Sequence, residues 1–372
     1  MKLRTYYKYL TILCILLISY ILVILFNSDI SVTKNNKNEK SITDSDTILN
    51  MALILNSNCS KAKTELMLQA LDSISAELQK SYAIFNVTDY NNSYEDTIAA
   101  ATGSGASLVI CPDSSFEEAI YNLQTSYINV YFLIIDGIPH NSDYSDTTIN
   151  YNVIPLTYDD AEIGFLAGCA LAYDGYKNIS FVGLEDSQSS QYFYGLIHGI
   201  NYASQTLNIN DITVNYGYTT DEKCENMIYK MYDEGSDIVV AYGDAIIQKT
   251  DDISAIRQKP CIICGENYSS DNDYIIASAY KNVSTTLHNC IYNFYNNNIT
   301  GGSIIKYSSE DHSVGLTFTK DSFKTFTPDI YNIIYQELAE NKIIVISDTT
   351  ISTEDLQLES IRLIKQIFDL PS

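Results

Sequence analysis

Short apolar runs alternate with amphipathic stretches along the chain from residue 47 onward. Short runs in which apolar residues predominate are typical of parallel strands that are buried on both faces of a sheet. Such runs lie at residues 51–55, 82–87, 108–111, 130–135, 178–182, 212–216, 238–241 and 261–264. The pattern predicts enough buried parallel strands for two sheets.

Amphipathic helices are predicted between these strands. Met67, Leu71, Ile74 and Leu78 are spaced by four, three and four residues, which places them on one helical face, and residues 163–171 show the same pattern. Alternation of strand and helix implies βαβ units with right-handed crossovers. We therefore expect an α/β fold with two lobes, each a parallel sheet flanked by helices.

Two segments are candidates for the crossings between lobes. A strand-like run at 151–154 leads into Pro155, and a helix with acidic residues in its first turn begins around residues 158–160. A polar stretch at 266–274 separates two further apolar runs. These crossings assign residues 47–155 and 272–372 to lobe one and residues 156–271 to lobe two. Spaced apolar residues within 353–368 predict a final packed helix.

The first 26 residues differ from the rest of the chain. Lys2, Arg4 and Lys8 precede an uncharged apolar run at 9–26, which is long enough to span a bilayer. This cation bias places the N-terminus inside and the body outside a bacterial cytoplasmic membrane. A cleaved signal peptide and a retained anchor both remain open; the absence of an Ala-x-Ala-like site favours retention. Residues 27–46 are polar and predict a flexible stalk.

Charge excludes one class of partner. The formal net charge of the whole chain is −24. The N-terminal segment carries three cations, so the rest of the chain has an even more negative net charge. Such a surface repels phosphate backbones, and the sequence contains no run rich in Lys or Arg. Nucleic acid is therefore not expected as a partner.

The sequence shows no recognisable catalytic, metal-binding or phosphate-binding motif. The eight cysteines lie mostly in apolar surroundings, which predicts buried thiols, and Cys261 and Cys264 point to opposite faces of a predicted strand. The four histidines are scattered and accompany no nucleophile motif. Gly103 and Gly105 lack the partners of a phosphate loop and predict a helix end. We expect no enzyme activity, no metal and no cofactor.

Asp136 is the one candidate that position alone supports. It follows the buried run 130–135, and open α/β sheets place their ligand contacts at the carboxyl ends of strands. Aspartate at a strand end is also a common turn former. Both interpretations remain open for this residue.

Residues 106–317 resemble the BMP family of basic membrane lipoproteins. These are substrate-binding proteins of bacterial ABC importers and include purine-nucleoside receptors. The block Gly164-Phe165-Leu166-Ala167-Gly168 carries the resemblance most distinctively. Further matching stretches occur in the family's order at 106–112, 115–119, 132–137, 179–183, 214–216, 232–240 and 281–283. The resemblance implies a two-lobed fold of the periplasmic-binding-protein type I kind.

The resemblance also implies ligand-binding positions. The family's ribose-contacting Asp falls on Asp136, its ligand-side Lys on Lys281, and its glycine-containing turn on Gly243 and Asp244. Lys63 and Thr64 stand where nucleoside-binding members carry a base-stacking Phe and its polar neighbour. Glu266 and Asn267 replace part of an Asp-x-Asp-Gln stretch.

Two functions follow from this resemblance. The first is an extracytoplasmic binding protein that takes a small polar ligand, possibly a nucleoside, between its lobes and delivers it to an ABC permease. The second is a membrane-anchored sensory or regulatory relative with an altered or lost pocket. The changed residues 63 and 64 suit the second function as well as a new ligand.

Overall fold

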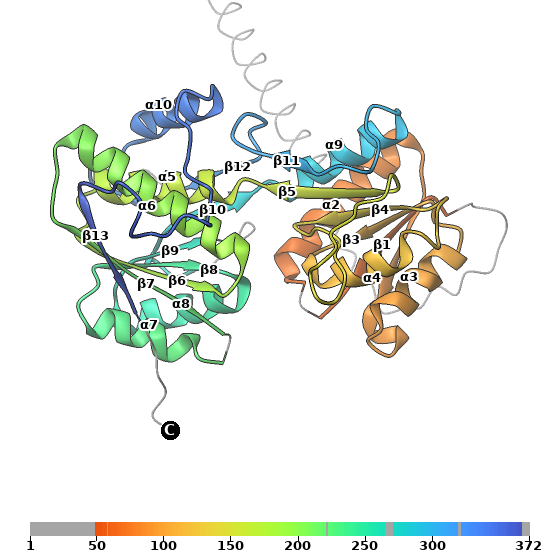
Figure 1. The fold of residues 1–372 in the computed structure, drawn as a ribbon, viewed down its shortest axis with the longest axis horizontal. Helices are drawn as coiled ribbons and strands as arrows, with labels where there is room; N and C mark the ends of the chain where they lie inside the picture. The colour runs from red at the N-terminus through yellow and green to blue at the C-terminus, as the bar shows by residue number, and fades with distance from the viewer. Residues whose placement is uncertain (1–48, 58, 221, 265–270, 319–320, 367–372) are drawn as a thin grey trace, which may run out of the picture. The chain divides into compact units, whose positions relative to one another are not determined.

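The computed structural model describes residues 49–57, 59–220, 222–264, 271–318 and 321–366. Within them, the first sheet has six strands in the order β11-β5-β4-β3-β1-β2, and every pair in it is parallel (Figure 1). This sheet defines lobe one. Its strands are β1 (Met51–Leu55), β2 (Tyr82–Asn86), β3 (Leu108–Cys111), β4 (Tyr131–Ile135), β5 (Val153–Tyr158) and β11 (Ile305–Tyr307).

The second sheet defines lobe two and has seven strands in the order β12-β10-β9-β8-β6-β7-β13. All of its pairs are parallel except β12 with β10, which is antiparallel. The strands are β6 (Asn178–Leu184), β7 (Ile212–Thr219), β8 (Ile238–Tyr242), β9 (Cys261–Cys264), β10 (Ile275–Lys281), β12 (Val314–Thr317) and β13 (Ile361–Lys365). Both sheets confirm the predicted α/β class.

Helices cover both faces of each sheet. In lobe one, α2 (Lys61–Leu78) and α9 (Val283–Tyr295) pack on one face, and α3 (Tyr94–Gly103) and α4 (Glu117–Leu123) on the other. In lobe two, α5 (Asp160–Tyr173) and α6 (Ser187–Leu207) lie opposite α7 (Cys224–Asp233) and α8 (Asp244–Arg257). The final helix, α10 (Pro328–Ala339), contacts α5.

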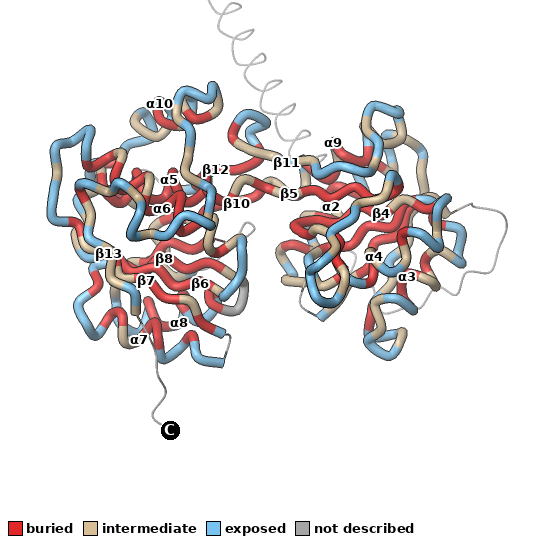
Figure 2. The backbone as a smooth tube through the Cα atoms, viewed as in Figure 1, coloured by how far each residue is buried: buried red, intermediate tan, exposed pale blue. Residues whose placement is uncertain are grey.

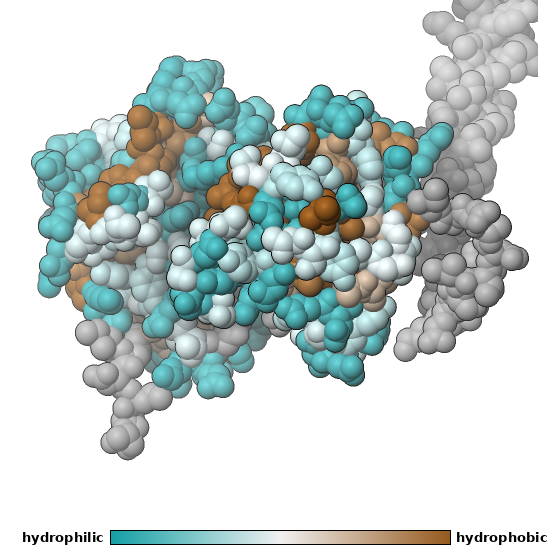
Figure 3. Space-filling view, turned by 45° about the vertical axis from the view of Figure 1, so that its right-hand side comes forward, coloured by the Kyte–Doolittle hydropathy of each residue, from teal (hydrophilic) through white to brown (hydrophobic). Residues whose placement is uncertain are grey.

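Alternate residues of the strands point to opposite faces of each sheet, as the strand period requires. Met51 and Leu53 of β1 join one core cluster, whereas Ala52 and Ile54 join another. The central strands β1, β3, β4, β8 and β9 are consequently buried along almost their whole length, whereas the edge strands β2, β11 and β13 are only partly buried (Figure 2). The face of the molecule drawn in Figure 3 is mostly hydrophilic, with smaller hydrophobic patches between.

Helices α5 and α6 approach each other unusually closely because glycines face the partner backbone. A Cβ on Gly168 would lie 2.1 Å from the carbonyl oxygen of Leu196, and one on Gly199 would lie 2.1 Å from that of Phe165. Gly164 and Gly195 make equivalent contacts one turn earlier. The Gly-Phe-Leu-Ala-Gly block is therefore a packing motif, and it fixes the helix whose first residue is Asp160.

The crossings differ from those predicted. The polar stretch 266–274 was expected to return the chain to lobe one, but β10 pairs with β9 in the second sheet. The chain reaches lobe one only after Lys281, with α9 and β11, and it re-enters lobe two with β12. Residues 272–372 are thus divided between the lobes, because a polar loop does not reveal which sheet the next strand joins.

The final helix expected over 353–368 is also wrong for the residues that the structure describes. Residues 361–365 instead form β13, an edge strand parallel to β7. Ile361 and Leu363 obey the strand period as well as they fit the proposed helix. The strand is favoured because β7, which would otherwise form the edge of the sheet, supplies hydrogen-bond partners for the backbone of residues 361–365.

Candidate functional site

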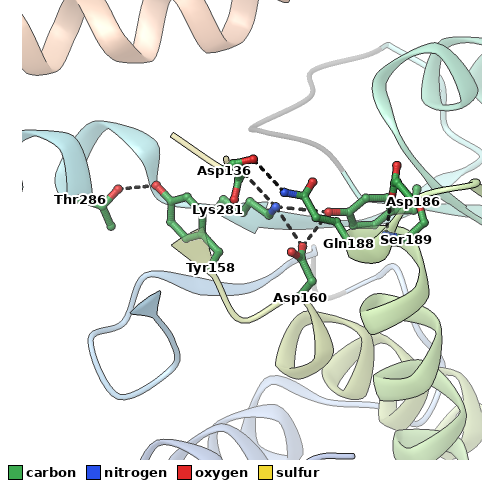
Figure 4. A network of polar contacts seen from close by, with 9 residues as sticks. Asp136, Tyr158, Asp160, Asp186, Gln188, Ser189, Lys281 and Thr286 are labelled. Atoms are coloured by element: carbon green, nitrogen blue, oxygen red, sulfur yellow. Dashed lines mark hydrogen bonds and ion pairs between the residues drawn. The ribbon is translucent and has the colours of Figure 1, made fainter. Parts of the chain in front are cut away.

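Lys281 is the centre of a buried polar cluster (Figure 4). Its Nζ lies 3.0 Å from Oδ2 of Asp136 and 2.9 Å from Oδ1 of Asp160. The ammonium also donates to the hydroxyl of Tyr242 at 3.2 Å, and that hydroxyl donates to Oδ1 of Asp160 at 2.7 Å. The cluster therefore joins residues that are remote in sequence through one cation.

The cluster lies at the carboxyl ends of strands from both sheets. Lys281 and Tyr242 end β10 and β8, Asp136 follows β4, and Asp160 opens α5 two residues after β5. Parallel strands present their carboxyl ends at one edge of a sheet, which is where open α/β sheets bind ligands. The position of the cluster is thus the one expected of a ligand site.

The backbone holds Asp136 in a specific conformation. Its φ of 53° lies in the left-handed region, which aspartate tolerates better than most residues. The Asp136 N–H donates to the carbonyl oxygen of Leu156 at 2.7 Å, and Nε2 of Gln188 from α6 donates to the Asp136 carbonyl at 3.1 Å. These bonds fix the direction of the Asp136 side chain.

Two tyrosine rings flank the ammonium. Nζ of Lys281 lies 5.5 Å from the ring centroid of Tyr158 and 5.8 Å from that of Tyr242, which is cation–π range. The hydroxyl of Tyr158 is hydrogen-bonded to the hydroxyl of Thr286 on α9. The ring of Tyr192 on α6 lies 5.2 Å from that of Tyr242. Aromatic side chains thus keep the cation in a largely dry environment.

Two carboxylates share one ammonium, and all three residues are at least nine-tenths buried. Burial, to which the Asp136 carboxylate adds, raises the pKa of Asp160 to about 6 against the attraction of Lys281. Burial opposes the charge of Lys281, but Asp136 and Asp160 outweigh it and raise its pKa well above the usual range. Both directions follow from an excess of one negative charge over the three groups.

Oδ1 of Asp136 is a buried, unsatisfied hydrogen-bond acceptor of the cluster. It is buried and has no hydrogen-bond donor among the residues that the structure describes. A buried carboxylate oxygen without a donor costs free energy, so such atoms are expected to find a partner in the functional state. The geometry therefore offers one strong acceptor to a donor group of a ligand.

The titration of Asp160 predicts how stability depends on pH. Its pKa is higher in the folded protein than its ordinary value of 3.8, so the folded state binds the proton more tightly. This contribution to stability is present below about pH 4 and is lost as the pH rises through about 6, a loss of about 2–3 kcal/mol. The raised pKa of Lys281 adds no slope in this range.

Urea unfolding of the full chain between pH 4.5 and 7.5 would measure this effect, with Asp160→Asn as the comparison. We expect the difference in unfolding free energy between the variant and the wild type to move in favour of the variant as the pH rises. A difference that stays constant over this range would contradict the titration.

The other predicted site residues are placed as follows. Lys63 is buried in the first turn of α2, and Thr64 donates to Sγ of Cys59 at 3.4 Å. Gly243 caps α8 with a φ of 105°, and Asp244 is the first residue of that helix. Glu266 and Asn267 lie outside the described residues. Of the predicted site residues that the structure describes, Asp136 and Lys281 are the pair in direct contact.

Sequence reasoning missed several members of the cluster. They are Tyr158, Asp160, Gln188, Tyr242 and Thr286. Asp160 was treated only as the acidic start of a helix, and Tyr242 only as part of a turn. The position of both at a strand end or just beyond one was the available signal, the same signal that identified Asp136.

A separate cavity of about 820 Å³ opens at the carboxyl ends of β6 and β7. Its lining presents polar and apolar surface in similar amounts and consists of Glu185, Asp186, Ser187, Ser190, Tyr218, Thr219, Thr220, Lys223, Met227, Lys365 and Gln366. It contains no member of the charged cluster and none of the predicted site residues. We place the candidate site at the buried charges and the unsatisfied acceptor Oδ1 of Asp136, not at this cavity.

Two absences hold for the described part of the chain. No group of three or more His, Cys, Asp or Glu side chains there is placed to hold a metal ion. No described helix is long and apolar enough to cross a membrane, and the apolar segment at 9–26 lies outside those residues. The cysteines described are thiols, and all but Cys59 are buried.

A family model decides the affiliation of the chain. The Bmp model, described as ABC transporter substrate-binding protein PnrA-like, matches residues 60–351. The chain belongs to this family. Bmp proteins bind substrates outside the cytoplasm and are in general not enzymes; membership implies a small-molecule ligand and a membrane permease as partners. The resemblance seen in the sequence is confirmed.

Solved structures confirm the type I periplasmic-binding fold. A solute-binding protein of an ABC transporter system from Aeropyrum pernix K1 has a TM-score of 0.61 at 14% identity, covering 80% of this chain and 93% of its own. One from Conexibacter woesei DSM 14684 has a TM-score of 0.61 at 16% identity, covering 80% and 99%.

A transcriptional activator of the comK gene from Bacillus halodurans has a TM-score of 0.61 at 15% identity, covering 78% of this chain and 96% of its own. At such identities these similarities show the fold alone. No curated protein matches the sequence.

Proposed function

We propose that this Bmp protein binds a nucleoside through its ribose and delivers it to an ABC permease for import. The carrying observation is Oδ1 of Asp136, a buried carboxylate oxygen without a donor, at the position where the family contacts ribose. A ribose hydroxyl is a donor of the required kind, and a hydrogen bond to a charged acceptor contributes about 1.5–3 kcal/mol.

The cluster supports binding rather than bond breaking. Lys281 has a pKa well above its usual range, so it remains a cation and is unsuited to act as a general base or nucleophile. Its ammonium orients Asp136 from one side. We accordingly assign the cluster a role in recognition.

Lys63 occupies the position at which nucleoside-binding relatives contact the base. In nucleoside-binding relatives the corresponding position carries an aromatic side chain that stacks on the base, a contact that contributes about 1–3 kcal/mol. Here the position holds a buried lysine. Recognition of the base in this protein therefore relies on residues other than residue 63, and the ribose end carries the proposal.

The proposed location is the outer face of a bacterial cytoplasmic membrane. Residues 9–26 would anchor the chain, and the polar residues 27–46 would connect the anchor to the lobes. The family's extracytoplasmic role agrees with this location.

A thermal-unfolding panel tests the proposed ligand class. Purine and pyrimidine nucleosides, D-ribose, free bases and amino acids would each be added to the full chain in detergent. A ligand at 100 times its dissociation constant adds about 2.7 kcal/mol of stability, which raises the melting temperature by several degrees. We expect nucleosides to raise it and free bases to have little effect. A panel in which no nucleoside raises it would contradict the proposal.

The second candidate function is that of a membrane-anchored sensory or regulatory relative whose ligand pocket is altered or lost, and Lys63 in place of the stacking residue is the observation that favours it. The same panel separates the two functions. A protein that has lost its pocket shows no shift with any nucleoside, whereas an import receptor shows a saturable one.

A further inference from the structure

Asp160 competes with Asp136 for the ammonium of Lys281. The two carboxylates accept from Nζ at 2.9 Å and 3.0 Å, and the Tyr242 hydroxyl takes the third bond at 3.2 Å. An ammonium has three N–H donors, so these three acceptors use them all. Lys281 therefore has no N–H left for a ligand in this arrangement.

The way the three N–H groups of Lys281 are shared determines which oxygen of Asp136 lacks a donor. Lys281 bonds Oδ2 and leaves Oδ1 without a donor among the described residues. In a dry environment an ammonium facing a single carboxylate is attracted to both of its oxygens. Asp160 and Tyr242 hold the ammonium and prevent this approach. Asp136 and Asp160 lie on opposite sides of the Lys281 ammonium (Figure 4).

We propose that Asp160 is a positioning residue of the ligand site. By holding Lys281, it keeps Oδ1 of Asp136 open to a hydroxyl donor of the ligand. This inference rests on the proposed function, because it assigns Asp160 a role in the site where the nucleoside binds. Asp160 itself touches Lys281 and Tyr242 rather than the ligand.

The surroundings of Asp160 identify it as the group that titrates. The titratable groups facing it are Lys281 on β10, Tyr242 on β8, Asp136 after β4 and Tyr192 on α6. Both tyrosines have pKa values well above their usual range, because burial disfavours their charged forms. Neither they nor Lys281 changes charge between pH 5 and 7.5.

The other carboxylates at the start of α5, the N-cap Asp159 and Glu162, bond elsewhere. Asp159 pairs with Lys306 at 2.5 Å, and Glu162 accepts from the Ser309 N–H at 2.7 Å. Glu162 also has a raised pKa, chiefly because of burial. It is therefore the matched control for Asp160: a partly buried carboxylate on the same helical turn that does not contact Lys281.

Acidification should act through this arrangement. The pKa of about 6 means that Asp160 gains a proton between pH 7 and 5 and then no longer attracts Lys281 by charge. The ammonium is free to approach both oxygens of Asp136 and to compete with the ligand. Affinity for a ligand hydroxyl should therefore decrease as the pH falls.

The test is calorimetric titration of the full chain in detergent with guanosine at several pH values from 5 to 7.5. We expect the wild type to bind about tenfold more weakly at pH 5 than at pH 7.5, in line with a loss of about one hydrogen bond. Asp160→Asn should bind about tenfold more weakly at pH 7.5 and show little further dependence on pH. Glu162→Gln should follow the wild type.

Three binding results would overturn the inference. The first is an Asp160→Asn variant with the affinity and pH profile of the wild type, and the second is a Glu162→Gln variant that abolishes the pH dependence. A pH-independent variant that still binds as tightly as the wild type would likewise count against a positioning role.

A ligand-free readout separates this inference from the proposed function. In a crystal structure of Asp160→Asn at pH 7.5, Nζ of Lys281 should lie about 3 Å from both oxygens of Asp136. An unchanged Nζ position refutes the positioning role even if guanosine binds. If guanosine does not bind the wild type, the proposed ligand fails, and this structure still decides the role of Asp160. A wild-type crystal at pH 5 provides the same readout if the variant does not fold.

Discussion

Replacing Gly168 by alanine should destabilise the protein by about 4 kcal/mol or more, although alanine is ordinarily the better helix former. The added Cβ would lie 2.1 Å from the carbonyl oxygen of Leu196 and 2.8 Å from the backbone nitrogen of Ile200. Backbone atoms cannot rotate away as a side chain can, so α5 and α6 must separate. Helix α5 is almost entirely buried, as is the middle of α6, and separation opens their packed interface.

Gly103→Ala is the matched control for this substitution. Gly103 is the last residue of α3, and a Cβ there meets no atom within 4 Å. Alanine should be neutral or stabilise by about 0.5–1 kcal/mol at such a position. Urea unfolding of both variants measures the contrast. Equal unfolding midpoints for the two variants would show that the close approach of α5 and α6 does not limit stability.

Lys281→Met should destabilise the folded protein by about 3–5 kcal/mol at pH 7.5. Removing the ammonium leaves the carboxylates of Asp136 and Asp160 buried together without a cation. Breaking a buried ion pair by removing one partner is costly, because the remaining charge is uncompensated. At pH 5 the Asp160 carboxylate can neutralise by taking up a proton, because burial raises its pKa, so the deficit relative to the wild type should shrink.

Lys306→Met is the control for the loss of an exposed cation. Lys306 pairs with Asp159 at 2.5 Å, but nearly half of its side chain is accessible to solvent. An exposed pair of this kind contributes about 1 kcal/mol or less. Urea unfolding at pH 5 and 7.5 tests both variants. Similar losses of unfolding free energy for Lys281→Met and Lys306→Met would indicate that the buried cluster contributes no more to stability than an exposed ion pair.

The fold was predictable from sequence where burial alone decides the structure. Strands such as β1 and β3 are short apolar runs, and their burial on both faces leaves a pattern that few other structures produce. The strand β13 was missed because its apolar residues also fit a helix. Its state depends on β7, a partner that local pattern cannot reveal.

The candidate site was predictable only in part for a related reason. Asp136 and Lys281 carry signals of their own, a strand end and a family match, and the structure joins them in one ion pair. Asp160 and Tyr242 belong to the site only because they contact Lys281. That contact depends on how strands of the two sheets end near one another. No spacing along the chain encodes that contact.

Titration calorimetry with guanosine, on the wild type and on Asp136→Ala, tests the central claim most directly. The matched control is Asp348→Ala, which removes an exposed carboxylate that accepts from the N–H and the hydroxyl of Thr350 in a local turn. We predict saturable binding to the wild type and to Asp348→Ala, and at least about a tenfold loss of affinity in Asp136→Ala. Equal affinities for all three proteins would contradict the account.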